Sequence, residues 1–287
     1  MTVEEFLQEK SQCVEAALEN CLSNYSNAPP GLIAAMKYSL LAGGKRLRPA
    51  LALGACELLG GKQSDAMPAA CALEMVHTYS LIHDDLPCMD DDDLRRGKPT
   101  SHKKFNEATA ILAGDGLLTM AFYELARTGR ADAVAVLAEA SGVGGMAGGQ
   151  YHDMLSLGET CDIKDLQRIH ACKTGALITA SLHLGAIFAD ASSEQINALT
   201  GYGRHLGMLF QITDDILDVT GVSQLLGKSV GKDEQSSKAT YPAVVGIEQA
   251  RILAQEAAEA ACDELSLFGE AAEIFHVLTR YILKRNR

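Results

Sequence analysis

Apolar residues recur at spacings of three and four positions along most of this chain, and this periodicity limits the possible folds more than any other sequence feature. Such spacing places apolar side chains on one face of an α-helix, whereas half-buried strands alternate apolar and polar residues. That alternation is nearly absent here. The pattern predicts helices over 3–22, 31–60, 67–85, 106–128, 131–146, 163–190, 194–219, 242–265 and 270–285.

The composition also favours helices. Hydrophobic residues make up 47% of the chain but aromatic residues only 5%, and Trp is absent. Ala and Leu, which are strong helix formers, recur throughout. The turn-rich segments between the periodic stretches do not resemble a flexible interdomain linker, so we predict one all-α domain over residues 1–287.

The formal net charge of −12 narrows the range of partners. Nucleic acids and anionic membrane surfaces attract basic proteins, so neither is expected to be the main partner. A small anionic substrate is compatible with this charge only if cations or metal ions gather locally around it.

Cysteine usage and the N-terminus predict a cytoplasmic protein. The eight cysteines are scattered singly, without a CxxC pair, which is typical of reduced thiols. The first residues, MTVEEFLQEK, are acidic and lack the basic and apolar regions of a signal peptide. We also expect no membrane span, because no apolar run reaches the roughly 18 residues that a span requires.

A pair of carboxylates is predicted on one helix face near residue 214. Asp214, Asp215 and Asp218 end the apolar run LGMLFQIT. Positions i and i+4 stack on one face of a helix, so Asp214 and Asp218 would point the same way, with Asp215 about 100° around the axis. Two like charges at this spacing repel unless a cation joins them. Hard oxygen ligands suit Mg²⁺, which usually also binds waters and substrate phosphates.

A second acidic cluster begins at Asp84 and Asp85 and continues at Asp90 to Asp93. Pro87 lies between these groups and disfavours a continuous helix, because it removes a hydrogen bond and clashes with the preceding turn. Helical arithmetic alone therefore leaves the geometry of this cluster open. One acidic run is more often a solvated loop or helix end than a metal site, but two such runs after apolar segments favour the metal site.

Cations that a phosphate-bearing substrate requires lie near these motifs. Three of them follow a glycine pair in GGKRLRP, two follow the first acidic cluster, and others stand in ACKTGAL and in the polar stretch 221–240. Arg binds phosphate bidentately and Lys acts as a point charge. Each cation taken alone is more often a surface charge, so the prediction depends on their combination.

Five motifs stand in order from about residue 30 to the end of the chain: GGKRLRP, HDDLPCMDDDDLRRGKPT, ACKTGAL, FQITDDILD and GKSVGKDEQSSKATYP. In content and order they closely resemble the short-chain trans-prenyl-diphosphate synthases, especially the bacterial type of farnesyl diphosphate synthase. The resemblance implies a bundle of about ten or more helices around a central cavity. It also implies that the two Asp motifs face each other across the cavity mouth, and that the protein is a homodimer.

The resemblance assigns roles residue by residue. Metal binding falls to Asp84, Asp85, Asp90, Asp214 and Asp218. The allylic diphosphate would be held by Arg95, Lys173, Gln211 and Lys238, with Lys228 as a further candidate. Isopentenyl diphosphate would be held by Lys45, Arg48, His77 and Arg96. We expect Lys173, Thr174, Gln211 and Lys238 to be the catalytic residues.

Two of these side chains have ordinary structural alternatives. His77 follows Met75 and Val76, so by itself it reads as a hydrogen-bonded core histidine, and Gln211 by itself reads as a buried polar contact. The implied chemistry supports the functional interpretation. Diphosphate leaves carbon readily only when its charge is neutralised, which Mg²⁺ and fixed cations achieve electrostatically. The hydroxyl of Thr174 and backbone carbonyls would stabilise the resulting allylic cation, and an apolar cavity would exclude water.

Tyr79 and Ser80 are predicted to contact the substrate, and the Tyr79 ring is predicted to limit product length. They precede Asp84 by five and four positions, which is about 7.5 and 6 Å along a helix axis. In related geranylgeranyl enzymes that share the Pro-Cys insertion, a smaller or flexible residue commonly holds the position of Tyr79, so its ring favours a fifteen-carbon product.

Three alternatives remain open at this point. The first is a geranyl or geranylgeranyl diphosphate synthase. The second is a terpene cyclase, which would not need a second diphosphate site and whose second metal motif normally departs from DDxxD. The third, from another class, is a non-catalytic partner subunit or helical scaffold.

Overall fold

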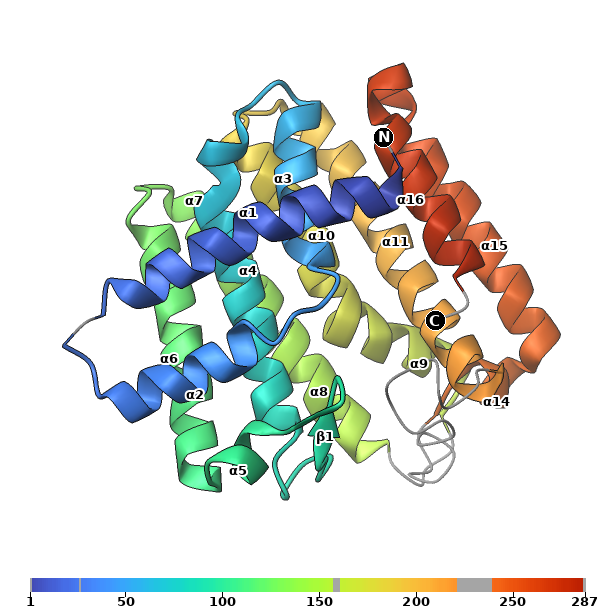
Figure 1. Ribbon diagram of the computed structural model, residues 1–287. Coiled ribbons are helices and arrows are strands. Elements are labelled where there is room, and N and C mark those ends of the chain that lie inside the picture. Colours follow the sequence, from blue (N-terminus) through green and yellow to red (C-terminus); the bar gives the residue numbers. More distant parts are fainter. Residues whose placement is uncertain (1, 26, 157–160, 221–238, 286–287) are drawn as a thin grey trace.

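The structure of the protein is a computed structural model, and it describes residues 2–25, 27–156, 161–220 and 239–285. Within these ranges the fold is helical apart from one short hairpin (Figure 1). The helices are α1 (Val3–Ser23), α2 (Pro30–Leu40), α3 (Leu47–Leu58), α4 (Gln63–Asp84), α5 (Ser101–Lys104), α6 (Glu107–Ala126), α7 (Ala131–Ser141), α8 (Met146–Leu155), α9 (Ile163–His170), α10 (Ala176–Phe188), α11 (Ser193–Thr220), α14 (Tyr241–Val245), α15 (Ile247–Glu264) and α16 (Glu273–Lys284). A π-helical turn, η1 (Ala171–Gly175), joins α9 to α10, and a 3₁₀ segment, η2 (Ser266–Ala272), precedes α16. Strands β1 (Leu94–Arg95) and β2 (Lys98–Pro99) form the hairpin.

The predicted all-α fold is confirmed, but two predicted helices are each divided and helix α8 was missed. The stretch 242–265 is divided into α14 and α15 at Gly246, whose φ is 83°. The stretch 31–60 is divided into α2 and α3, because the chain takes positive φ angles at Gly43, Gly44 and Arg46. Helix α8 lies in a glycine-rich segment that the apolar periodicity did not mark as helical. Its glycines allow close packing, because a Cβ on Gly149 would lie 2.3 Å from the backbone nitrogen of Lys173.

Side-chain caps fix where several helices begin. The Thr2 hydroxyl accepts from the amide of Glu5, and the Glu5 carboxylate accepts from the amide of Thr2, which forms a capping box. Asn106 caps α6 by accepting from the amide of Thr109 at 2.8 Å. Removing such a cap typically costs about 1 kcal/mol.

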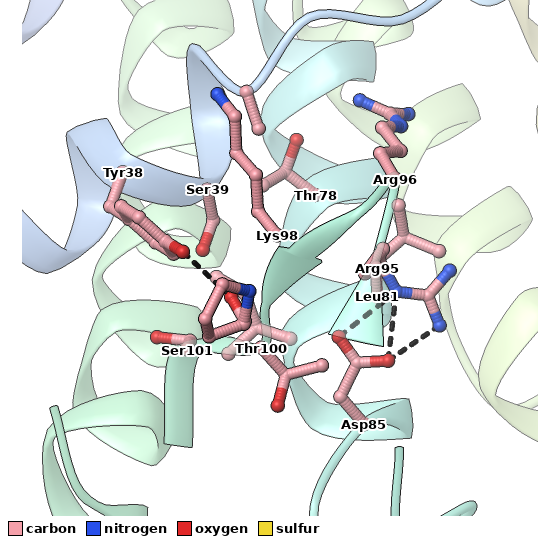
Figure 2. Close-up of a pocket in the computed structure, with 13 residues that line it drawn as sticks. Tyr38, Ser39, Thr78, Leu81, Asp85, Arg95, Arg96, Lys98, Thr100 and Ser101 are labelled. Carbon is pink, nitrogen blue, oxygen red and sulfur yellow. Dashed lines mark hydrogen bonds and ion pairs between the residues drawn. The ribbon is translucent and has the colours of Figure 1, made fainter. Parts of the chain in front are cut away.

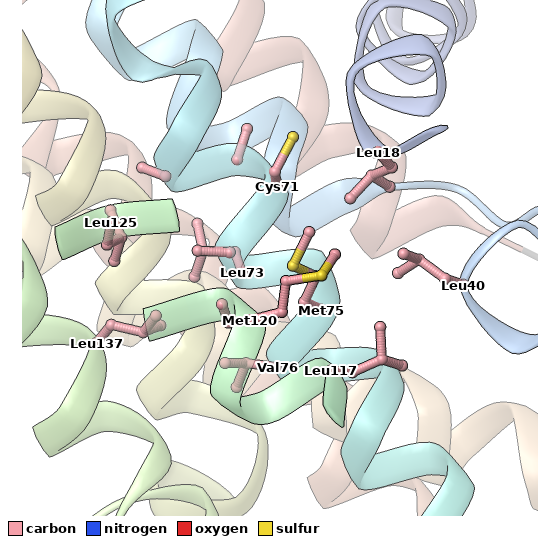
Figure 3. Close-up of a cluster of buried hydrophobic side chains, with 14 of the residues drawn as sticks. Leu18, Leu40, Cys71, Leu73, Met75, Val76, Leu117, Met120, Leu125 and Leu137 are labelled. Carbon is pink, nitrogen blue, oxygen red and sulfur yellow. The ribbon is translucent and has the colours of Figure 1, made fainter. Parts of the chain in front are cut away.

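The first of two apolar clusters is centred on α4 and α6 and also includes residues of α1, α2 and α7 (Figure 3). Met75 and Val76 of α4 pack with Leu117 and Met120 of α6, and all four are nearly inaccessible to solvent. Burying each such side chain contributes about 1.5–3 kcal/mol. This packing fixes the orientation of α4, the helix that ends at the first acidic motif.

The second apolar cluster holds α11 in place. Leu206 and Leu209 of α11 pack with residues of α3, α10, α15 and α16. Helix α3 joins the clusters, because its Leu53 belongs to the first and its Leu51 to the second. The single domain over residues 1–287 remains a prediction that this packing supports.

One helical stretch of the described residues, Ile163–Phe188, is long and apolar enough by composition to cross a membrane, and the mean hydropathy of its most apolar 18-residue window is 1.3. Every 18-residue window of this stretch contains Lys173, so it is not an uninterrupted apolar run, and the expectation of no membrane span stays a prediction. Within the protein 61% of its most apolar window is buried, and a core helix of a soluble protein meets the same criterion. Its packing against α3 and α11 makes it a central core element here.

Candidate active site

The second acidic motif has the predicted helical geometry. Asp214, Asp215 and Asp218 lie in the last two turns of α11, so Asp214 and Asp218 share a face. The side chain of Asp214 is 47% exposed. Asp215 points elsewhere and is only 3% exposed. Asp214 therefore faces solvent at the site, whereas its neighbour Asp215 lies in the protein interior.

The first acidic motif marks the end of a helix. Helix α4 stops at Asp84, and Pro87 lies in the following turn, as its helix-breaking character predicts. The loop then folds back, and the Asp90 amide donates to the carbonyl of Asp84 at 2.8 Å. Burial raises the pKa of Asp84 to about 6, against the opposing charge of Lys173.

Both acidic motifs lie at the C-terminal ends of their helices. The negative end of a helix dipole disfavours a carboxylate and favours a cation, by about 0.3–1 kcal/mol each. The ends of α4 and α11 therefore add to the negative potential of Asp84 and Asp214. Such a position is suited to binding a divalent cation.

Asp85 is committed to an ion pair with Arg95 (Figure 2). The Arg95 Nε donates to both carboxylate oxygens of Asp85 at 2.8 and 2.9 Å, and Nη2 lies 2.6 Å from Oδ1. The sequence assigned these residues separately, Asp85 to a metal ion and Arg95 to a diphosphate. The structure brings them together, so Asp85 orients the guanidinium in this state.

Lys173 lies in the π-helical turn η1, a distortion that is frequent at functional sites. Its ammonium pairs with Asp153 of α8 at 2.6 Å, and both side chains are largely buried. The charge of Lys173 partly offsets the rise that burial causes in the pKa of Asp84, so these two groups are within electrostatic reach. Sequence reasoning missed Asp153, whose only signal is its place in the glycine-rich segment that packs on η1.

A close approach of η1 to α11 connects Lys173 to the second motif. A Cβ on Gly207 would lie 2.8 Å from the Cα of Gly175, so only glycine permits this contact. The Thr174 hydroxyl consequently reaches α11 and donates to Gln211 Oε1 at 2.9 Å. The η1 turn thus packs on the helix of Asp214, while its Lys173 is within electrostatic reach of Asp84.

The four residues assigned to isopentenyl diphosphate converge in the structure. Lys45, Arg48, His77 and Arg96 line one pocket of about 330 Å³. Phe210 and Leu278 form apolar parts of its wall. The pocket therefore combines cations with apolar surface, as an isoprenoid diphosphate requires.

The three cations of the GGKRLRP loop all line this pocket, but they differ in burial and in partners. Arg46 is 4% exposed and pairs with Glu74 at 2.5 Å, so it anchors the loop to α4. Arg48 is half-buried, and its buried Nε has no hydrogen-bond partner among the described residues. A buried donor in this position is available to a phosphate oxygen.

The hairpin turn places Arg96 in the pocket wall. Arg96 and Gly97 both have positive φ, 52° and 74°, which is the two-residue turn that matches strand twist. The Arg96 guanidinium donates to the carbonyl of Gly43. It also lies where a Cβ of Gly44 would be, at 2.7 Å, so the glycine pair makes room for it.

His77 lies among these cations and is neutral. Its pKa is held well below the usual value, because the site is buried and because Arg48 and Arg96 repel an imidazolium. A neutral imidazole still donates one hydrogen bond. His77, for which the sequence left a hydrogen-bonded core histidine open as an alternative, thus lies on the pocket wall.

The C-terminal end of α16 also reaches the site. Arg285 lies 2.5 Å from Asp214 Oδ1, donates to the carbonyl of Phe210 at 2.9 Å, and stacks 4.2 Å from the centre of the Phe210 ring. Arg285 lines the same pocket as Arg48. Arg285 therefore occupies one carboxylate oxygen of Asp214 in this structure.

The remaining predicted residues fall into two groups. Lys228 and Lys238, and the stretch 221–238 to which they belong, are outside the described residues. Tyr79 is half-buried, packs on the first apolar cluster and meets the His83 ring edge-on at 5.7 Å. The Ser80 hydroxyl donates to the carbonyl of His77 at 2.9 Å, on its own helix.

Comparison with known proteins places this site in a family. Residues 29–273 match the model of the family Polyprenyl synthetase. Farnesyl diphosphate synthase of Geobacillus stearothermophilus is 48% identical over 88% of this chain and 87% of its own. The large subunit 1 of heterodimeric geranylgeranyl pyrophosphate synthase of Arabidopsis thaliana, a chloroplastic protein, is 49% identical over 89% of this chain and 72% of its own. The FPP/GFPP synthase of Zymomonas mobilis superposes with a TM-score of 0.87 at 36% identity, over 98% of each chain.

These similarities define an all-helical prenyltransferase. The chain belongs to the polyprenyl synthetase family, and the resemblance to trans-prenyl-diphosphate synthases is confirmed. It is an enzyme of the trans-prenyltransferase type. The names of its relatives include both farnesyl and geranylgeranyl synthases, so they do not fix the product.

Proposed function

We propose that the protein condenses dimethylallyl and then geranyl diphosphate with isopentenyl diphosphate to give farnesyl diphosphate and diphosphate. The observation that carries this proposal is the convergence of Lys45, Arg48, His77 and Arg96 in one pocket beside Asp214. Such a pocket is a second diphosphate site, which a condensation of two diphosphates requires and a terpene cyclase does not.

The donor set of the acidic motifs fits Mg²⁺. Among the described residues, no three His, Cys, Asp or Glu side chains converge closely enough to hold a metal ion by themselves. That fits a magnesium ion that takes one or two carboxylates and completes its shell with waters and substrate phosphates. Asp84, Asp90, Asp214 and Asp218 would hold the ions, and Asp85 would join them only after leaving Arg95.

The chain's own side chains would guide the reaction. Bound magnesium would neutralise charge on the departing diphosphate. Lys173 and Arg95 would bind the oxygens of that diphosphate while the carbon–oxygen bond breaks and its electron pair leaves with oxygen. The oxygens of Thr174 and Gln211 would face the allylic cation, and the double bond of isopentenyl diphosphate would attack it. The released diphosphate would accept the proton lost from the new chain.

A single assay tests this proposal. The protein is incubated with Mg²⁺, geranyl diphosphate and labelled isopentenyl diphosphate, and the products are separated by chain length. We expect one addition and a fifteen-carbon product. A twenty-carbon main product would favour the geranylgeranyl alternative, and no incorporation with any allylic starter would favour the non-catalytic subunit.

A homodimer is also proposed, and exposed apolar side chains on α6 support it. Ile111 is 43% exposed, Leu112 56% and Tyr123 53%. One relative is named as a subunit of a heterodimer, so a different partner is the alternative. Light scattering of the purified chain distinguishes a dimer from a monomer that awaits another subunit.

Metal binding is expected to weaken below about pH 6. The pKa of Asp84 is raised to about 6 by burial, so protons compete there with the metal. In the metal-free protein, the raised pKa of Asp84 contributes to the free energy of unfolding. This contribution is fully present at pH values below the ordinary pKa of 3.8 and is lost as the pH rises through about 6. The increase in Tm caused by Mn²⁺ should therefore be small at pH 5 and larger at pH 7, and Asp84→Asn should remove most of this dependence. A metal effect equal at both pH values would contradict it.

Removing Arg285 is expected to strengthen metal binding. Its ion pair with Asp214 must open when that carboxylate binds a metal ion. Asp214 is half-exposed, so the pair is worth about 0.2–1 kcal/mol, or roughly a 1.5- to 5-fold change in affinity. Titration of Mn²⁺ into Arg285→Gln should show this gain. Arg280→Gln, which removes an exposed pair with Glu273 on the same helix, is the control and should show none.

A further inference from the structure

A chain of hydrogen bonds runs from the η1 turn through α11 to the start of α14. The Thr174 hydroxyl donates to Gln211 Oε1 at 2.9 Å, and Gln211 Nε2 donates to Asp215 Oδ1 at 2.8 Å. The other Asp215 oxygen, Oδ2, accepts from the backbone amide of Tyr241 at 2.9 Å. The chain thus joins two predicted catalytic residues to an aspartate that has no assigned role.

Asp215 differs from the neighbouring aspartates of its motif. It is 3% exposed, whereas the Asp214 side chain is 47% exposed. Its carboxylate points toward Gln211, one helical turn earlier, and toward α14. A side chain held this way is not positioned to share a solvent-facing metal ion with Asp214.

The carboxylate of Asp215 fixes the direction of every bond in the chain. An ionised carboxylate only accepts hydrogen bonds, so Gln211 must turn its NH₂ group toward Asp215. The amide oxygen then faces Thr174, which donates its only proton to it. As a result, the remaining lone pairs of both oxygens are free to face positive charge.

We propose that Asp215 is a positioning residue that sets this polarity, so that Gln211 and Thr174 present oxygen lone pairs to the allylic cation. The inference rests on the proposed function and extends it. Preorganised dipoles aimed at developing charge lower a barrier without reorganisation during the reaction. The opposite direction would aim a hydroxyl proton and an amide NH₂ at that cation.

Asp215→Asn is expected to reverse the chain with almost no change in shape. The Tyr241 amide remains a donor and holds the Asn oxygen, so the Asn NH₂ group faces Gln211 and turns its amide over. Gln211 then donates to Thr174, whose proton turns outward. We expect kcat with geranyl and isopentenyl diphosphates to fall by about 10²-fold. Both KM values, Mn²⁺ affinity and Tm should change little.

The exchanged pair Asp215→Asn with Gln211→Glu provides the rescue. The Glu carboxylate accepts from the Asn NH₂ group and from Thr174, so the original polarity returns. We expect the double variant to recover at least tenfold in kcat over Asp215→Asn. Gln211→Glu alone sets two carboxylates against each other and should be the poorest of the three. A residue needed only for folding would not be rescued by this exchange.

The outcomes separate clearly. A kcat for Asp215→Asn within threefold of wild type, a loss explained by weaker Mn²⁺ binding, or a double variant no better than the single one would overturn the proposal. If Asp215→Asn does not fold, the double variant decides: activity supports the polarity and inactivity refutes it. Wild-type turnover is measured in the same assay, so an inactive wild type refutes the proposed function instead.

Discussion

Asp84→Ala is expected to lower kcat for the condensation of geranyl with isopentenyl diphosphate by about 10³-fold, and Asp214→Ala by a similar factor. Each substitution removes a carboxylate from the C-terminal end of a helix, where the electrostatic field favours a cation. Without the ion that each motif holds, the charge that develops on the departing diphosphate is no longer neutralised. Initial rates at saturating Mg²⁺ and both substrates measure the effect.

Asp93→Asn is the matched control for these variants. Asp93 belongs to the same acidic run but pairs with Lys103 at 2.8 Å on the surface, with its side chain 74% exposed. Its loss should change kcat by less than about twofold, since such surface pairs contribute little. The assignment of the motifs fails if Asp84→Ala keeps more than a tenth of the wild-type kcat, or if Asp93→Asn is equally damaging.

Tyr79→Met is expected to change the main product from fifteen to twenty carbons. Tyr79 precedes Asp84 on α4 by five residues, about 7.5 Å along the axis. Burial raises the pKa of Tyr79, and the charge of Asp84 raises it further, so the ring lies within electrostatic reach of the first motif. Replacing the ring with a flexible chain would open the path below the motif for one more five-carbon unit. Chromatography of the dephosphorylated products measures the chain lengths.

Tyr25→Met is the control for lost aromatic volume. Tyr25 packs against the same apolar cluster as Tyr79 but belongs to the segment that follows α1. It should reduce Tm without lengthening the product. If Tyr79→Met still makes only the fifteen-carbon chain, another residue sets the length.

The sequence predicted most of the helices and the geometry of the second acidic motif. Both follow from local periodicity: apolar spacing marks the buried face, and Asp214 and Asp218 are four residues apart. The break between α2 and α3 was missed because it depends on positive φ at Gly43 and Gly44 rather than on polarity. Helix α8 was missed because its glycines and polar residues do not show the apolar spacing of a helix.

The convergence of the diphosphate residues came from family resemblance and not from spacing. Lys45 and Arg96 are separated by 51 positions, and only the hairpin and the glycine pair bring them to one pocket. The pairs Asp85 with Arg95 and Lys173 with Asp153 were not predicted, because nothing local in the sequence indicates which opposite charges meet. The buried position of Asp215 was not predicted either, because its place within an acidic motif indicates an exposed carboxylate like that of Asp214.

The central claim is that two acidic helix ends grip divalent ions together with a prenyl diphosphate. A crystal of the protein grown with Mn²⁺ and an unreactive thio-analogue of geranyl diphosphate tests it directly, because anomalous scattering locates each ion. We predict manganese bound to Asp84 on one side and Asp214 on the other, bridged by diphosphate oxygens, with Arg285 displaced. Aspartates that point apart, with neither ion nor analogue between them, would contradict the account.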